Sequence, residues 1–351
     1  MVVVGVDVHK HTHTLVAIDE AGRQRGAKTV KAVTAGHREA VMWVREQFGA
    51  DVLWAVEDCR NMSVRLERDL LTAGQTVVRV PTKLMALVRS SARTRGKSDP
   101  IDALAVARAA LREPNLPVAC HDGVSREMKL LIDRRDVLVA QRTSAINRLR
   151  WLVHELDPEA APASRKLNTA KHQHALAHWL TTQSGTVAEI ARAELADVIR
   201  LTAEITALAQ RIAARAHEVA PTLLEITGCG ELMAAKLVGE AAGVTRFKSE
   251  AAFANHAGVA PIPVWSGNTT GRMRLSRSGN RQINRALYVI ALTQIRIAGS
   301  DGNAYHQRLR DEGKTHAEAL RCVKRRLSRI VYKALLTDHT ATTKPVHAAA
   351  A

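Results

Sequence analysis

The stretch VVVGVDV, at residues 2–8, decides the fold of the first third of the chain. Its valines favour an extended conformation, and a nearly continuous apolar run is typical of a strand that is buried on both faces. Residues 13–18 and the turn at 19–22 are typical of a hairpin. The segments that follow alternate between strand-like and helix-like patterns. Strands are expected at 13–18, 52–56 and 76–80, and helices at 36–48, 61–73 and 100–112. An α/β domain is therefore predicted.

The middle of the chain, residues 125–217, has helical periodicity almost throughout. Residues 157–166, with two prolines, are expected to connect two long helices into an antiparallel helical arm. Near its end, apolar residues step by three and four, which is the spacing of a coiled-coil seam. The seam needs a partner, either within the chain or from another copy, and its members are Val198, Leu201, Ile205, Leu208 and Ile212.

The last third begins near Pro221 and is expected to be mainly helical to about residue 337, with an irregular stretch at 258–280. An Ala- and Thr-rich tail from Asp338 is expected to be flexible. The predicted fold class is thus an α/β domain, an antiparallel coiled-coil arm and a mainly α domain. The predicted divisions are an α/β catalytic domain at 1–122, the arm at 123–217, the mainly α domain at 218–337 and the tail at 338–351.

The charge of the chain points to a polyanionic partner. Among 351 residues, 51 are Lys or Arg and 34 are Asp or Glu, a net charge of +17. Residues 218–351 are the most basic part, with 19 basic and 10 acidic residues. Aromatic residues make up only 3%, which disfavours recognition of single strands by base stacking. We expect contact with phosphate backbones instead.

Other sequence features restrict the class of protein. No apolar run reaches the roughly 18 residues that span a bilayer, so no membrane association is expected. The N-terminus does not resemble a secretory signal. The four cysteines are scattered without a CxxC pair, which fits a reducing cytoplasm and disfavours both a zinc ribbon and a disulfide scaffold.

Four carboxylates are the candidate catalytic and metal-binding residues. Asp7 lies within an apolar strand, where a carboxylate is costly unless it binds something. Glu57 ends a second strand. Asp99 and Asp102 are three residues apart at the start of a helix and so point the same way, although Asp99 could instead be a helix N-cap. Together the four are typical of a nuclease that holds two Mg²⁺ ions.

The histidines near Asp7 offer an alternative. His9, His11 and His13 have the same parity as Asp7, so on a continuous strand they would share its face, and a zinc site is conceivable there. Solvated histidines at a strand end are the simpler interpretation. Lys10 either contacts phosphate or covers a strand edge.

Three segments resemble the DEDD transposases of insertion sequences, a family related to the Piv/MooV DNA invertases. They are VGVDVHK at 4–10, AVEDCR at 55–60 and RGKSDPIDALAVARA at 95–109, the last being the most specific. The resemblance implies an N-terminal domain of the RNase H class, like the Holliday-junction resolvase RuvC. Its catalytic tetrad would be Asp7, Glu57, Asp99 and Asp102. Many members lack an acid at the position of Asp58, which on a strand would face away from Glu57.

The last third is similar to the same family over residues 226–261 and 265–288. The resemblance implies that Ser266 is the nucleophile. From the residues alone, Ser266 could equally belong to an ordinary polar loop, since no histidine is close in sequence to activate it. The Gly228-Cys229-Gly230 turn resembles a helix-hairpin-helix turn or an ordinary connection, and the basic run 324–326 is either a solvated face or a phosphate contact. The candidate nucleic-acid-binding residues are Lys10, Arg93, Arg95, Lys97, Arg272, Arg274, Arg277, Arg281 and Arg285.

The resemblance implies a transposase or site-specific recombinase of a mobile element. Such an enzyme would act on double-stranded donor and target DNA through a phosphoserine-DNA intermediate. It would be guided by a structured RNA, the bridge RNA, and would form dimers or tetramers in the bacterial cytoplasm, associated with the nucleoid. Two alternatives stay open: a hydrolytic RuvC-like junction resolvase or nuclease, and a non-catalytic basic protein that binds nucleic acid.

Overall fold

A computed structural model describes residues 1–57, 60–82, 84–85, 88, 98–113, 116–120, 123–163, 165–266, 273–275 and 279–343. The chain forms two compact units, residues 1–121 and residues 122–351. Among the described residues, no helix is both long and apolar enough to cross a bilayer.

The first unit is built on a mixed five-stranded sheet, which confirms the predicted α/β class. Its strand order is β3-β2-β1-β4-β5: β2 is antiparallel to β1 and β3, whereas β4 is parallel to β1 and β5. The valine-rich stretch is the central strand, as its apolar composition requires. The strands are β1 (Val2–Val8), β2 (Thr12–Ile18), β3 (Gln24–Lys31), β4 (Val52–Glu57) and β5 (Thr76–Val80).

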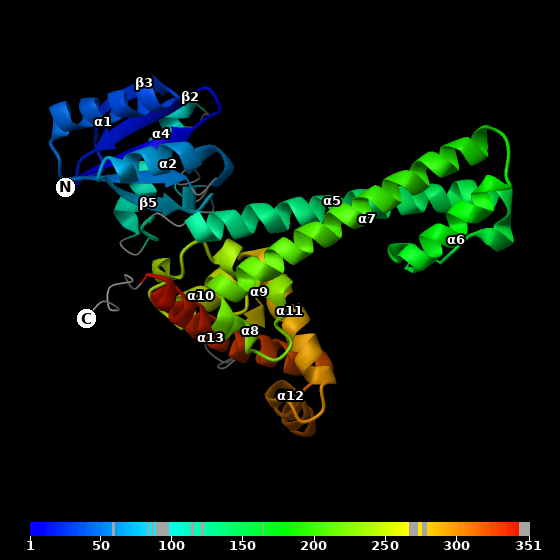
Figure 1. Ribbon diagram of the computed structural model, residues 1–351. Coiled ribbons are helices and arrows are strands. Elements are labelled where there is room, and N and C mark those ends of the chain that lie inside the picture. The colour runs from blue at the N-terminus through cyan, green and yellow to red at the C-terminus, as the bar shows by residue number, and fades with distance from the viewer. Residues whose placement is uncertain are drawn as a thin grey trace, which may run out of the picture. The chain divides into compact units, whose positions relative to one another are not determined.

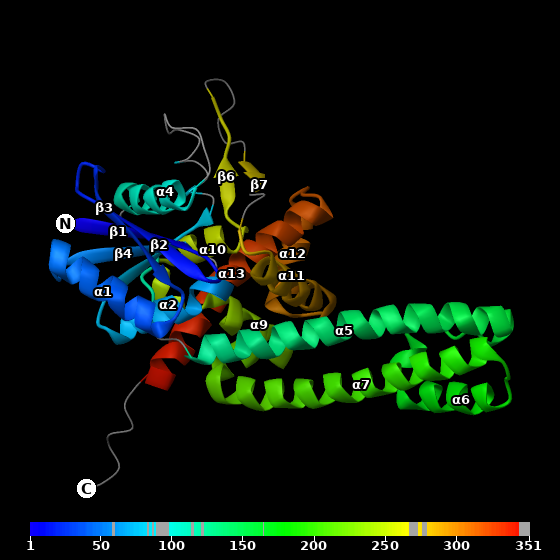
Figure 2. The same ribbon diagram turned by 90° about the horizontal axis from the view of Figure 1, so that it is seen from above.

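Helices cover both faces of this sheet. Helix α4 (Asp99–Arg112) packs on one face, and α1 (Thr34–Phe48) and α2 (Arg60–Thr72) cover the other, as Figure 2 shows. The hairpin predicted at the 19–22 turn is confirmed, since β2 and β3 pair across it, but the bounds of the edge strand β3 were not predicted from the sequence. Of its eight residues only Val30 is buried, so its polar sequence has no apolar pattern by which a strand could be recognised.

The second unit begins with the arm. Helices α5 (Gly123–Leu156) and α7 (Thr186–Val219) lie side by side (Figure 1). The predicted seam is confirmed: Val198, Leu201, Ile205 and Ile212 are buried and Leu208 is partly buried. Its partner lies within the chain, since Leu138 of α5 packs against Leu201 and Ile205.

The far end of the arm holds an element that the sequence did not reveal. Two short 3₁₀ turns and helix α6 (Ala170–Thr181) lie between the two long helices in the sequence. Leu176 and Leu180 of α6 pack against α5 and α7. Gly185 separates α6 from α7 with φ of 89°, a backbone conformation that favours glycine. The helical periodicity of the region concealed this reversal of direction.

The near end of the arm shares one hydrophobic core with the helices that follow it. Met128, Ile132 and Ile212 of the arm pack with Leu237, Phe253 and Leu287. The arm is therefore anchored in the helical body. The helices of that body are α8 (Pro221–Leu224), α9 (Glu231–Ala241), α10 (Glu250–His256), α11 (Arg281–Arg296), α12 (Asp301–Asp311) and α13 (His316–Thr343).

The prediction of a flexible tail from Asp338 is wrong for residues 338–343, and residues 344–351 lie outside the described residues. Helix α13 continues to Thr343, and the Asp338 side chain is only 3% exposed. Its carboxylate accepts hydrogen bonds from the backbone N–H groups of Thr222 and Leu223 at 2.9 and 3.3 Å. These donors belong to the first turn of α8 and have no partner within that helix, so Asp338 holds the end of α13 in place.

Candidate active site

Asp7 and Glu57 occupy equivalent positions on two neighbouring parallel strands. Strand β1 pairs with β4 so that Val6 lies opposite Val56, and the next residue on each strand is an acid. Neighbouring residues at the same register project from the same face of a sheet. Asp7 is 6% exposed, and Glu57, the last residue of β4, is half-buried.

Helix α4 brings the other two acids to this face. A Cβ atom on Gly5 would clash with the Ala103 carbonyl oxygen and with Ala107, so only glycine lets α4 lie directly against β1. Asp99 is one helical turn before Ala103, and Asp7 is two strand residues after Gly5. Both steps cover roughly 6 Å, which brings Asp99 level with Asp7.

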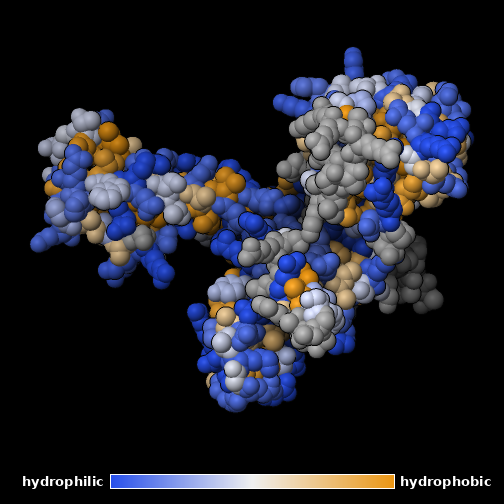
Figure 3. Space-filling model, turned by 180° about the vertical axis from the view of Figure 1, so that it is seen from behind, coloured by the Kyte–Doolittle hydropathy of each residue, from blue (hydrophilic) through white to orange (hydrophobic). Residues whose placement is uncertain are grey.

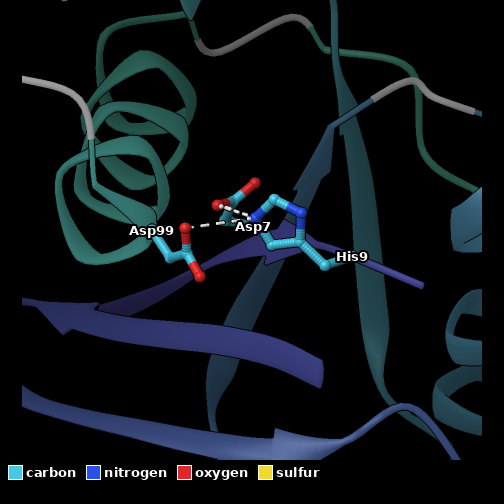
Figure 4. A group of neighbouring side chains, drawn as sticks. All are labelled: Asp7, His9 and Asp99. Atoms are coloured by element: carbon cyan, nitrogen blue, oxygen red, sulfur yellow. Dashed lines mark hydrogen bonds and ion pairs between the residues drawn. The ribbon is translucent and has the colours of Figure 1, made fainter. Parts of the chain in front are cut away.

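Asp7, His9 and Asp99 form the centre of the candidate site (Figure 4). The His9 Nε2 atom lies 2.9 Å from Asp7 Oδ2 and 3.3 Å from Asp99 Oδ1. One donor atom from each of the three residues lies within 4.8 Å of the others. The side chains of His9 and Asp99 are 47% and 53% exposed, so the cluster is buried at Asp7 and open to solvent on its other side.

The environment of Asp7 disfavours its ionised form. Burial raises the pKa of Asp7 above its ordinary value, His9 lowers the pKa, and the negative charges of Asp102 and Asp99 raise it further. Asp102 is 8% exposed on α4, and its charge acts on Asp7. A buried carboxylate with two acidic neighbours is a place where a bound cation is strongly stabilised.

Asp99 is not the N-cap of its helix, the alternative that the sequence left open. Ser98 occupies that position, and its carbonyl oxygen accepts from the Asp102 N–H at 3.0 Å. Lys10 is exposed directly after His9. The candidates Arg93, Arg95 and Lys97 lie outside the described residues, as does Asp58.

The three histidines do not form a common site. Strand β1 ends at Val8, and the chain turns into β2, where His13 pairs with Val8 and so faces away from Asp7. His11 is exposed in the turn. Within the described residues, only Asp7, His9 and Asp99 form a group of three potential metal ligands. His9 is therefore a potential metal ligand together with Asp7 and Asp99. The sequence spacing did not distinguish it from His11 and His13.

Ser266 lies in the second unit on a β-ribbon. Strands β6 (Pro261–Pro263) and β7 (Met273–Leu275) are antiparallel and project from the helices (Figure 2). Ser266 follows β6 and is exposed, next to Trp265, which is 54% exposed. The sequence predicted an irregular stretch here, because each strand has only three residues.

The ribbon is fixed at its base. The Asn280 N–H donates to the His256 carbonyl oxygen at 2.6 Å, and Asn280 caps α11 by accepting from two backbone N–H groups. Gly279 has φ of 108° and packs against Gly258, where a Cβ atom would clash with the backbone. The same Asn280 donates to Glu240 at 2.7 Å. Ser266 is thus attached to a support whose base is held by several hydrogen bonds.

Basic side chains surround this ribbon. Arg274 on β7 and Arg281 and Arg285 at the start of α11 are exposed, while Arg272 and Arg277 lie outside the described residues. The turn at Gly228 is a packed connection: Gly228 has φ of 84° and contacts Thr293 of α11. Burial raises the pKa of the Cys229 thiol to about 12, which leaves it unreactive.

Two family models and several insertion-element proteins match the chain. A family model described as a transposase matches residues 4–158, and a second, the transposase IS116/IS110/IS902 family, matches residues 220–307. The 42 kDa protein of insertion element IS900 from Mycobacterium paratuberculosis is 27% identical and is covered over 95% of both chains. The 44.8 kDa protein of IS116 from Streptomyces clavuligerus is 26% identical, covering 95% of this chain and 94% of the relative.

Among solved structures, the chain is similar to Thermus thermophilus RuvC in complex with a Holliday junction substrate. The sequence identity is 16% and the TM-score is 0.27, over 33% of this chain and 98% of RuvC. The two family models, the first over the first unit and helix α5 and the second over the helical body, carry the identification together with the nearly full-length relatives. The chain belongs to the IS110/IS116/IS902 family of insertion-element transposases, phosphoryl-transfer enzymes that cleave DNA and transfer its strands.

Proposed function

We propose that this transposase moves a mobile element by metal-dependent DNA cleavage and exchange through a covalent phosphoserine-DNA intermediate. The observation that carries the proposal is the common face of Asp7, Glu57 and α4, to which strand register and the Gly5 contact bring acids from three separate elements. Acids that are distant in sequence gather in this way when they serve a common ligand.

The donor set fits a divalent cation. Carboxylate oxygens are the ligands that Mg²⁺ prefers, and the imidazole of His9 lies between two carboxylates, where positive charge is stabilised. We assign the two expected Mg²⁺ ions to Asp7, Glu57, Asp99 and Asp102. When bound, such ions stabilise charge on the attacking and leaving oxygens of a phosphodiester.

Ser266 is the proposed nucleophile. Its Oγ forms a bond to the DNA phosphorus, the bond from phosphorus to one sugar oxygen breaks, and the Oγ proton passes through water to that leaving oxygen. The released strand end keeps a hydroxyl. Attack of a second strand's hydroxyl on the phosphoserine restores Ser266, so the number of phosphodiester bonds is conserved. Arg274 is a nearby candidate for neutralising the phosphate charge.

A structured guide RNA and a homo-oligomer complete the proposal. The net charge of +17 supplies the electrostatic attraction that an RNA partner needs. The arm offers exposed apolar side chains that a second copy could cover, among them Trp151 at 74% and Ile190 at 47% exposure.

Two substitutions test the proposal on DNA that contains the element's ends, with its RNA and Mg²⁺. Ser266→Ala removes the hydroxyl, and Asp102→Asn removes one charge without changing shape. We expect each to reduce strand exchange by about a thousandfold or more. The matched controls are Ser184→Ala and Asp51→Asn, which alter exposed residues elsewhere.

The same assay separates the rival functions. If Ser266→Ala cuts DNA at the normal rate while Asp102→Asn does not, the chain is a hydrolytic nuclease. If neither Asp7→Ala nor Asp102→Ala changes DNA processing in cells, the chain acts only by binding nucleic acid.

A further inference from the structure

A basic cavity of the second unit lies beside the base of the ribbon that carries Ser266. It has a volume of about 1150 Å³ and is bordered by Pro261 of β6 and by Met273 and Arg274 of β7. Its other walls come from the start of α10, residues 259–260, α12, α13 and the turn between α12 and α13. Seven of the lining side chains are basic and three are acidic; the basic ones are Arg274, Arg308, Lys314, Arg321, Arg325, Arg326 and Arg329.

The three acids do not neutralise this cavity. Glu250 pairs with Arg329 at 2.8 Å. Glu312 pairs with Lys314 at 2.9 Å and with Arg308 at 3.6 Å. The third acid, Glu318, accepts hydrogen bonds from the backbone N–H and hydroxyl of its helix-capping threonine. Four arginines therefore remain without an ion pair among the described residues, and they are Arg274, Arg321, Arg325 and Arg326.

The arginines of α13 form a row. Arg321, Arg325 and Arg329 are spaced by four residues, so they lie on one helical face about 6 Å apart and extend about 12 Å. Duplex DNA carries one charge for each ~1.7 Å of its axis, so a row of this length faces several phosphates. A single small anion would use only one member of the row.

Aromatic contacts hold part of the wall rigid. The guanidinium groups of Arg308 and Arg326 lie over the Tyr305 ring, 5.1 and 5.0 Å from its centre. The basic run 324–326 is divided between two roles. Lys324 turns inward, where it donates to Asn284 Oδ1 at 2.6 Å and burial lowers its pKa. The surface of the α12 lobe is mostly hydrophilic in the view of Figure 3.

We propose that this groove holds the backbone of the duplex DNA that flanks the phosphate attacked at Ser266. The occupant is DNA because the groove is continuous with the ribbon, so a strand that reaches Ser266 passes along it. This assignment rests on the proposed role of Ser266, but the binding that it predicts does not depend on catalysis.

The test measures binding of a fluorescent random-sequence duplex to the full chain as a function of salt. Arg321→Ala/Arg325→Ala is compared with Arg211→Ala/Arg296→Ala, which removes two exposed arginines elsewhere in the same unit. We expect the groove variant to bind about tenfold more weakly. Its slope of log K against log salt should fall by about 2, at roughly 0.9 for each lost phosphate contact. Equal binding by the two variants would overturn the proposal, as would a loss confined to a duplex RNA probe.

Cys322 provides a second measurement that uses the native groove. Its thiol lines the cavity, so DNA that carries a mixed disulfide on a tether at a flanking phosphate should exchange with it: the Cys322 sulfur bonds to the tether sulfur, and the small thiol of the mixed disulfide leaves. Cys322→Ser should abolish the cross-link. A cross-link of equal yield in that variant would contradict the proposal.

Ser266→Ala and Asp102→Asn separate this proposal from the proposed function. Both should keep the normal salt dependence and the Cys322 cross-link. If the binding and cross-linking results are as predicted but these variants still exchange strands, the catalytic assignment is wrong and the DNA-binding groove is supported. If the binding and cross-linking results are not as predicted but these variants lose strand exchange, the groove proposal is wrong and the catalytic assignment is supported.

Discussion

At the scale of single residues, the site depends on a carboxylate placed where folding alone disfavours it. Asp7 is buried in the central strand, and the charges of Asp102 and Asp99 act on it. Such positions store free energy that a ligand can recover, and this is the usual conflict between stability and function. The sequence shows the conflict directly, since an acid within VVVGVDV has no structural explanation.

Asp7→Asn should therefore stabilise the metal-free protein while destroying its response to metal. The amide removes a buried charge and its repulsion, so we expect the free energy of unfolding to rise by about 1 kcal/mol. The wild type should gain stability on addition of Mg²⁺, and the variant should not. Thermal melts with and without Mg²⁺ measure both effects. A variant less stable than wild type in the absence of metal would contradict this reasoning.

His9 shows where prediction from the sequence ended at this scale. The spacing of His9 from Asp7 predicted that the two share a strand face, but the same spacing predicted this for His11 and His13 as well. Only the end of β1 at Val8 separates them, and that end depends on pairing with β2. The acids were predictable because each one is unusual in its own element, whereas the histidine becomes unusual only through its neighbours.

At the scale of elements, a buried series of hydrogen bonds connects β2 to α1 and α2, on the face of the sheet opposite the acids. His13 Nε2 lies 3.2 Å from His37 Nε2, and His37 Nδ1 lies 2.7 Å from Asp69 of α2. His13 is 2% exposed, and burial together with His37 lowers its pKa from 6.5 to about 4. His13 is thus neutral when folded at neutral pH.

Because His13 in this hydrogen-bond series is buried and neutral, the first unit should become less stable at acid pH. Between pH 6.5 and about 4, the unfolded state binds a proton at His13 that the folded state does not, so stability falls as pH falls through this window. The loss should approach about 3 kcal/mol near pH 4. Urea titrations at several pH values measure it. His13→Leu should flatten the dependence, whereas His11→Ala, at an exposed site, should not; equal curves for all three would contradict the assignment.

Elements with a clear apolar pattern were predictable, and those without one were not. The seam of α7 was legible because burial by α5 imposes its spacing of three and four. The edge strand β3 and the ribbon β6–β7 have little buried surface, so their sequences carry no such pattern. The reversal into α6 was hidden because both sides of it are helical.

At the scale of the whole molecule, the arm is the natural place for a second copy. Arg148 of α5 pairs with Glu194 of α7 at 2.6 Å. Trp151 lies about one helical turn after Arg148 and Ile190 about one turn before Glu194, so the two lie at a similar height along the antiparallel helices. Hydrophobic patches interrupt the hydrophilic surface of the arm in Figure 3. A large aromatic residue that is 74% exposed on a rigid helix is typical of an interface anchor.

Trp151→Ser/Ile190→Ser should weaken self-association by about tenfold or more. Met42→Ser/Met62→Ser is the matched control, since it alters two exposed apolar residues of the first unit. Sedimentation velocity over a range of concentrations measures the association constant. If both variants associate as the wild type does, the arm is not the interface.

The central claim is that the acids of the first unit and the serine of the second act in one reaction. The most direct measurement is to incubate the protein with its end DNA, RNA and Mg²⁺, denature it, digest it and locate the nucleotide by mass spectrometry. We expect a nucleotide phosphate on Ser266, formed by the wild type with Mg²⁺ but not by Asp102→Asn or without metal. Cleaved DNA with free ends, and no nucleotide attached to Ser266, would contradict it.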